Sequence, residues 1–207
     1  LTAAATVAVW IDGAIDGTSS VALSDATTFG AVTGIHVAGV LAGSLKVSGG
    51  SIAATANEAI HLAAAVSGTI LVSKATVTGG GTHAVTFAAD LSGSLTVQRA
   101  ALSGGGGHAI RLAGLAGGTV VVAGGSIAGT DAAVKINGAA DSSSSVKLMN
   151  VAATGTADHG VWAVGAFGGT MTVVGGSITA ATGGKNAIHF DADVPSSVAV
   201  FSKHFRL

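Results

Sequence analysis

Residues 92–116 read SGSLTVQRAALSGGGGHAIRLAGLA and contain every part of a repeating unit. Leu95 and Val97 alternate with a polar residue, which predicts a short strand with one buried face. Leu102 belongs to a second short strand, and the glycines that follow it break the pattern. A third short strand, residues 109–113, buries Ile110 and Leu112. The unit therefore consists of three short strands and a glycine-rich corner.

Aliphatic residues equivalent to those of this unit recur with one period along the chain. The equivalents of Leu95 are spaced by 24 to 27 residues: Val21, Leu45, Ile70, Leu95, Val120, Val146, Met171 and Val198. The equivalents of Ile110 keep the same range of spacings: Val9, Ile35, Ile60, Val85, Ile110, Val134, Val161 and Ile188. Two shorter ladders agree with them: Ile52, Val77, Leu102, Ile127 and Ile178, and Ile15, Leu41, Val66, Leu91, Ala140, Phe167 and Val194. Independent ladders with a common period indicate an internal repeat.

A period of about 25 residues with several short strands predicts an all-β parallel β-helix, or β-solenoid. Each strand would pair with its equivalent one coil away, about 4.8 Å along the axis, so that equivalent side chains stack in columns. We expect about eight coils, each with three short strands. Residues 1–207 would form a single solenoid domain, either a segment of a longer solenoid or a subunit that assembles end to end.

The pattern over residues 9–205 resembles the pectin-lyase-like superfamily, which includes polysaccharide lyases, phage tailspikes and autotransporter passenger domains. The resemblance lies in the three strands per coil, the glycine-rich corners and the stacked aliphatic residues, not in a diagnostic motif. It implies a right-handed parallel β-helix, closest in character to non-enzymatic surface, adhesin or filament solenoids. Because one fold hosts many functions, it says little about activity.

Particular features of the sequence argue against other folds. Glycine pairs that begin near Gly49, Gly79, Gly104, Gly124 and Gly175 would interrupt any helix about every 25 residues. A transmembrane barrel needs aromatic girdles, whereas aromatic residues make up only 4% of this chain. Calcium-binding solenoids repeat about every nine residues, which is not the period here.

The composition narrows the classes of function. Only 9% of the 207 residues are charged, against about 25% in an ordinary soluble domain. The chain has no cysteine, which excludes disulfides, thiolate nucleophiles and zinc–thiolate sites. A net charge of −1 gives no reason to expect nucleic-acid binding. Despite a mean hydropathy of +0.68, no apolar run of about 18 residues occurs, so we expect no membrane insertion.

One outward position collects the side chains most suited to binding, and we call it the polar column. It lies between the two buried residues of the Ile110-type strand and contains Trp10, His36, His61, Thr86, Arg111, Lys135, Trp162 and His189. Trp offers an apolar face to a sugar ring, and His, Arg and Lys donate hydrogen bonds to hydroxyls or carboxylates. A simpler interpretation is that these long side chains only cover a solvent-exposed face and bind nothing.

A zinc site needs three or four ligands, so we predict no metal site. We likewise predict no cofactor.

A second recurring position, which we call the corner column, holds His83, His108 and His159, with Glu58, Ala132 and Asn186 in the same slot. We expect these histidines to hydrogen-bond the backbone of turns. His189 lies near Asp191 and Asp193, a group that suits acid–base chemistry. Resemblance to the hydrolases of the superfamily would also require grouped Asp residues and a Gly-His-Gly, for which Asp158-His159-Gly160 is only partial. We therefore predict no catalytic residues.

These observations favour a structural or adhesive module of an extracellular or cell-surface assembly, such as a filament, an appendage or a passenger-type adhesin. Two outward faces carry little charge and suit packing against another subunit. Expected partners are further copies of the chain or neighbouring solenoid segments. The alternative is a glycan-binding or glycan-cleaving β-helix, like a tailspike or polysaccharide lyase, that uses the polar column.

Overall fold

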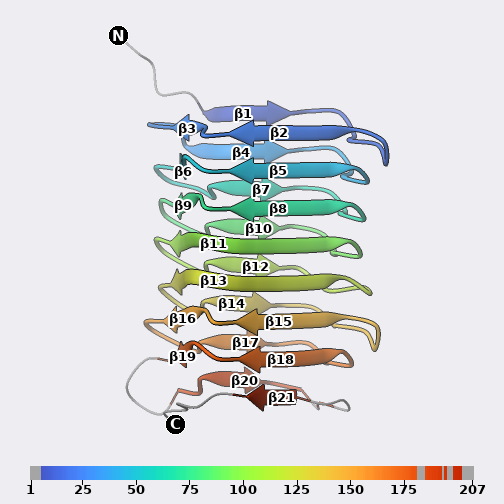
Figure 1. Ribbon diagram of the computed structural model, residues 1–207, viewed down its shortest axis with the longest axis vertical. Helices are drawn as coiled ribbons and strands as arrows, with labels where there is room; N and C mark the ends of the chain where they lie inside the picture. Colours follow the sequence, from blue (N-terminus) through green and yellow to red (C-terminus); the bar gives the residue numbers. More distant parts are fainter. Residues whose placement is uncertain (1–5, 181–184, 193, 195–197, 202–207) are drawn as a thin grey trace.

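The computed structural model describes residues 6–180, 185–192, 194 and 198–201, and these form a parallel β-solenoid of about seven turns (Figure 1). All strand pairs are parallel, and successive equivalent strands are about 25 residues apart. In Figure 1 the chain runs leftward along the nearer sheet and rightward along the fainter, more distant one while it descends. The coil is therefore right-handed. The described residues include no helix long and apolar enough to span a membrane.

The strands form two sheets. The 8-stranded sheet contains β1 (Val7–Ile11), β4 (Thr33–Val37), β7 (Ile60–Leu62), β10 (Val85–Phe87), β12 (Ile110–Leu112), β14 (Val134–Ile136), β17 (Val161–Ala163) and β20 (Ile188–Phe190). The first arm of the 13-stranded sheet contains β2 (Ser20–Ser24), β5 (Ser44–Ser48), β8 (Thr69–Ser73), β11 (Ser94–Gly104), β13 (Thr119–Gly129), β15 (Ser145–Met149), β18 (Thr170–Val174) and β21 (Val198–Phe201). Its second arm contains β3 (Thr27–Thr28), β6 (Ser51–Ala53), β9 (Thr76–Gly79), β16 (Ala152–Gly155) and β19 (Ser177–Thr179).

The predicted register is confirmed strand by strand. Leu95 pairs with Ile70 on one side and Val120 on the other, and Ile110 pairs with Val85 and Val134. The fourth ladder is a row of isolated bridges that runs from Ile15 to Phe167. The repeat predicts about eight coils. The Ile110 ladder has eight strands, and the chain makes about seven complete turns between the first and the last of them.

The inward side chains of all these ladders make one continuous core. Leu45, Ile70, Leu95 and Val120 are fully buried, as are the members of the Ile110 ladder between Ile35 and Val161. Strands β7, β12, β14 and β17 show the burial pattern buried, partly buried, buried, because their central side chains point outward. The core thus places the polar column on the outer face of the 8-stranded sheet.

The two arms of the 13-stranded sheet meet at a bend that we call the left-handed corner. One residue in each coil has a φ between 50° and 68° there: Asp25, Gly49, Lys74, Arg99, Gly124, Asn150 and Gly175. The N–H of Asp25, Gly49 or Lys74 donates to a carbonyl of the next coil at 2.8–2.9 Å, which keeps the bend in register. In β11 and β13 the two arms join into single strands of 11 residues, so these coils have two strands instead of the predicted three.

Candidate functional site

The polar column is a continuous row across the 8-stranded sheet. Its members are joined by parallel pairing in the order Trp10, His36, His61, Thr86, Arg111, Lys135, Trp162 and His189. Each lies between two inward-facing residues of its strand, so the pleat turns its side chain away from the core. The structure therefore brings together all eight residues that the sequence singles out.

The column is less accessible than a simple outward row would be. Trp10 is 57% exposed, but the residues from His36 to His189 are only partly exposed or buried. Thr86 is 1% exposed, and its hydroxyl has no hydrogen-bond partner. Thr86 keeps its place in the column but is buried, because the longer side chains of His61 and Arg111 flank it in register.

At the N-terminal end of the column the rings stack on one another along the solenoid axis. The Trp10 and His36 ring centroids are 4.4 Å apart, and those of His36 and His61 are 4.9 Å apart with planes 5° from parallel. Burial and the neighbouring His61 lower the pKa of His36. Nδ1 of His61 lies 3.5 Å from Glu58 Oε2. The stack therefore presents ring edges, not ring faces, to solvent along most of its length.

The middle of the column holds two cations with assigned partners. With the Asn137 amide oriented so that its oxygen faces the guanidinium, Arg111 donates from Nη2 and Nε, both at 3.0 Å. The Nζ of Lys135 lies 3.9 Å from the centroid of the Trp162 ring, in a cation–π contact. Lys135 thus covers one face of the Trp162 ring.

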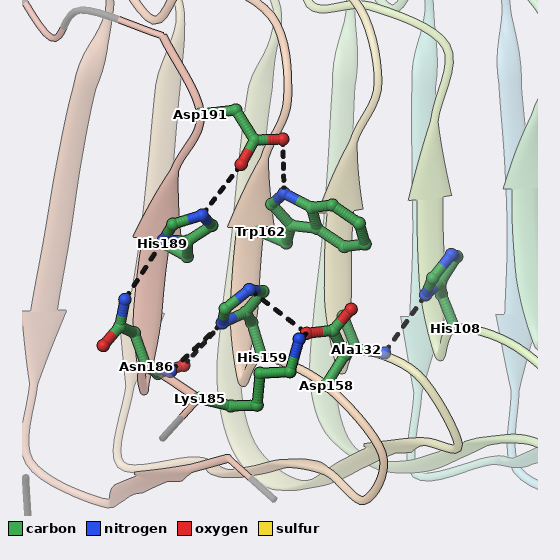
Figure 2. A network of polar contacts seen from close by, with 9 residues as sticks. All are labelled: His108, Ala132, Asp158, His159, Trp162, Lys185, Asn186, His189 and Asp191. Carbon is green, nitrogen blue, oxygen red and sulfur yellow. Dashed lines mark hydrogen bonds and ion pairs between the residues drawn. The ribbon is translucent and has the colours of Figure 1, made fainter. Parts of the chain in front are cut away.

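The C-terminal end of the column forms a polar network (Figure 2). The Trp162 indole N–H donates to Asp191 Oδ2 at 2.9 Å, and His189 Nε2 lies 2.8 Å from Asp191 Oδ1. The Asn186 amide nitrogen lies 3.1 Å from His189 Nδ1, on the other side of the imidazole. Because Asp191 contacts Nε2 and Asn186 contacts Nδ1, both nitrogens of His189 have partners.

His159 of the corner column joins this network to the neighbouring turn. Its ring stacks on His189, with centroids 4.1 Å apart, and meets Trp162 edge-on. Its Nε2 lies 3.1 Å from Asp158 Oδ1, and the same oxygen lies 3.1 Å from Lys185 Nζ. In Figure 2 these side chains converge over the last coils, where Asp158 and Lys185 come from adjacent turns.

The corner histidines replace carbonyl groups as acceptors between coils. Nδ1 of His83 accepts the backbone N–H of His108 at 2.9 Å, and Nδ1 of His108 accepts that of Ala132 at 3.2 Å. Nδ1 of His159 accepts the N–H of Asn186 at 3.1 Å. An accepting Nδ1 carries no proton, so the neutral ring has its proton on Nε2. The expectation that corner histidines bond turn backbone is confirmed.

Burial lowers the pKa of each corner histidine. For His108 the pKa falls to about 4, first because the ring is removed from water and second because His83 lies against it. Burial likewise lowers the pKa of His83 and of His159, although Asp158 opposes the change at His159. These rings are therefore neutral at pH 7 and serve as fixed acceptors.

The network at the end of the column offers one carboxylate–imidazole pair, Asp191 with His189, beside an indole. Of the acidic pair expected beside His189, Asp191 makes the contact and Asp193 lies outside the described residues. No group of three or more side chains that suit a metal ion occurs in the described part of the chain. The bridge from Asp158 to Lys185 was not among the sequence predictions, although it joins equivalent positions of adjacent coils: each residue directly precedes a member of the corner column, His159 or Asn186.

Comparisons with known proteins add no relative: no family model, curated protein or solved structure matches this sequence. The parallel β-solenoid is shown by the coordinates. Membership in the pectin-lyase-like superfamily stays a prediction.

Proposed function

We propose that the chain is a structural or adhesive β-solenoid module of an extracellular or cell-surface assembly, such as a filament, an appendage or a passenger-type adhesin. The observation that carries this proposal is the unbroken stack of coils. Backbone pairing and a buried apolar core run from the first described coil to the last. Such a stack makes a stiff rod, because each coil is held by its neighbours on both sides.

The two ends of the described stack support association end to end. Within the described residues β1, β2, β20 and β21 pair on one side only. Large apolar side chains are exposed at the same places: Trp10 and Phe29 at one end, and Val198, Val200 and Phe201 at the other. Unpaired strand edges beside apolar side chains are templates for further pairing. A neighbouring solenoid segment or a second copy of the chain would cover them.

Substitutions in β21 test this association. Val200 pairs in register with the buried Val173, so it points inward in the last described strand, where it is 38% exposed, while its neighbour Ala199 pairs with Thr172 and points outward. Val200→Asp should shift the protein from large assemblies to single chains in sedimentation velocity, because a carboxylate would be buried in the junction. Ala199→Asp is the matched control and should assemble like the wild type. Equal assembly of both variants, with both folded by circular dichroism, would contradict the proposal.

A second candidate function is binding or cleavage of a glycan along the polar column. Two features support it: Trp10 has one ring face without a ring partner among the described residues, and Asp191 joins His189 to Trp162. An indole face packs on the apolar side of a sugar, and a carboxylate–imidazole pair bonds hydroxyls.

Oligosaccharide binding measured on three variants tests this candidate. Trp10→Ala removes the exposed indole, whereas Trp162→Ala and Arg111→Ala change the covered part of the column. If a glycan binds, Trp10→Ala should weaken binding at least tenfold. Unchanged affinity in all three variants would remove the polar column from consideration.

A further inference from the structure

Two adjacent coils carry a basic residue at the left-handed corner. Other coils have Gly49, Gly124 and Gly175 there, or the short side chains of Asp25 and Asn150. Glycine, Asn and Asp are the residues that tolerate a positive φ. Two residues of the left-handed corner are of other types: Lys74, with φ 53°, and Arg99, with φ 50°. Their neighbouring positions place two cations one coil apart.

At the left-handed corner, the side chain of one coil lies over the equivalent residue of the next coil. A Cβ added to Gly49 would collide with the carboxylate of Asp25, and one added to Gly175 would collide with the amide of Asn150. A Cβ on Gly124 would lie 3.6 Å from Cγ of Arg99. Each side chain thus leans over the glycine of the following coil.

Lys74 differs from Asp25, Arg99 and Asn150, because the corner residue one coil later is Arg99 instead of a glycine. At this place alone among the described corners, two long side chains follow each other. They border an open pocket of about 320 Å³, which is lined by Ser73, Lys74, Gln98, Arg99 and Ala123. The pocket lies on the 13-stranded sheet, away from the polar column.

The two cations at this pocket have no acidic partner among the described residues. Neither Lys74 nor Arg99 forms an ion pair with any described residue, whereas Lys185 contacts Asp158 and Lys135 covers Trp162. Both cations are exposed, and Gln98 and Ser73 add neutral hydrogen-bonding groups. Like charges in neighbouring coils repel, and a left-handed backbone is unfavourable for long side chains. Strain of this kind, repeated on adjacent coils, points to a function.

We propose that this pocket binds an oxyanion group, a sulfate, phosphate or carboxylate, carried by a ligand about the size of a monosaccharide. Arg99 would hold two oxygens through its planar fork, and Lys74 would supply a second point charge. Gln98 and Ser73 would bond neighbouring hydroxyls. The volume lies at the lower end of small-molecule pockets and exceeds what a lone inorganic ion fills. This site is independent of the proposed rod function.

Glycine variants provide a clean test, because glycine already occupies this corner in three other coils. We would titrate the protein calorimetrically with glucose 6-sulfate, glucose 6-phosphate and glucuronate, and use glucose as the neutral probe. Lys74→Gly and Arg99→Gly should each weaken binding of the acidic probes at least tenfold, and the double variant should abolish it. Lys46→Gln, which removes an exposed cation outside the pocket, is the matched control and should bind like the wild type.

The ranking of the acidic probes identifies which oxyanion the pocket prefers. Affinity should fall as the salt concentration rises, since both charges are exposed. Thermal melts should show that the glycine variants keep the midpoint of the wild type. The proposal is overturned if glucose binds as tightly as the acidic sugars, if the folded double variant keeps its affinity, or if no acidic probe binds the wild type.

Discussion

The imidazole of His108 accepts a backbone N–H from the next coil where a carbonyl would ordinarily do so. His108→Ala leaves the buried N–H of Ala132 without a partner, and we expect a loss of about 1–3 kcal/mol in the free energy of unfolding. Urea denaturation measures this loss. His61→Ala is the comparison: His61 is partly exposed, its carboxylate contact is 3.5 Å long, and its removal should change stability by less than about 1 kcal/mol.

The same histidine makes stability depend on pH. Its pKa is about 4 in the folded chain and 6.5 in the unfolded chain, so between these values the unfolded chain binds more protons. Stability should therefore fall as the pH drops from 6.5 to 4 and should be flat for this group above 6.5. Burial of His83 and His159 acts in the same direction.

Thermal midpoints measured across this range check the sign of the pH effect. The slope should be smaller in His108→Ala, because one of the titrating groups is gone. A wild-type protein that gains stability on acidification through this window would contradict the assignment of His108 as a neutral acceptor.

Ile110 tests the inward assignment of its ladder. It is fully buried between Val85 and Val134, so Ile110→Asp places a carboxylate in the core and should cost several kcal/mol. Ala101→Asp is the control, since Ala101 is exposed on β11. A loss that is equally small in both variants, measured by urea denaturation, would show that the register is wrong.

At the scale of the elements, the left-handed corner has glycines for two different reasons: a positive φ, and close approach to the backbone of the neighbouring coil. Gly124 and Gly125 both have positive φ, but a Cβ at Gly124 meets only Arg99 Cγ at 3.6 Å, whereas one at Gly125 collides with the carbonyl oxygen of Ala100. Gly124→Ala should cost about 1–2 kcal/mol for the backbone alone. Gly125→Ala should cost more, because the neighbouring coil must also move. Equal losses in chemical denaturation would contradict the close approach of these coils.

The strands were predictable because aliphatic residues at a fixed period mark them directly, as Leu95 and Ile110 do. The joining of the two arms in β11 and β13 was not predictable, since the corner residue has the same left-handed φ in coils whose arms stay separate. Pairing predicted which residues share the polar column, but not that their rings stack along the axis. That stacking depends on side-chain rotamers, and so does the burial of Thr86 beneath its neighbours.

At the scale of the whole molecule, each coil contacts only the coils before and after it, as in other solenoids. The described stack has about seven turns, which corresponds to roughly 34 Å at a rise of about 4.8 Å per coil. Its sides carry few charges, and its ends expose apolar side chains beside strand edges that are paired on one side. The proposed end-to-end association would cover these apolar side chains and the unpaired strand edges.

Cryo-electron microscopy of the wild-type protein at high concentration tests the proposed rod most directly. The rod proposal predicts particles much longer than roughly 34 Å, in which the axial repeat of about 4.8 Å continues across the junctions between chains. Particles that remain single chains at every concentration, and that turn over oligosaccharides, would contradict it.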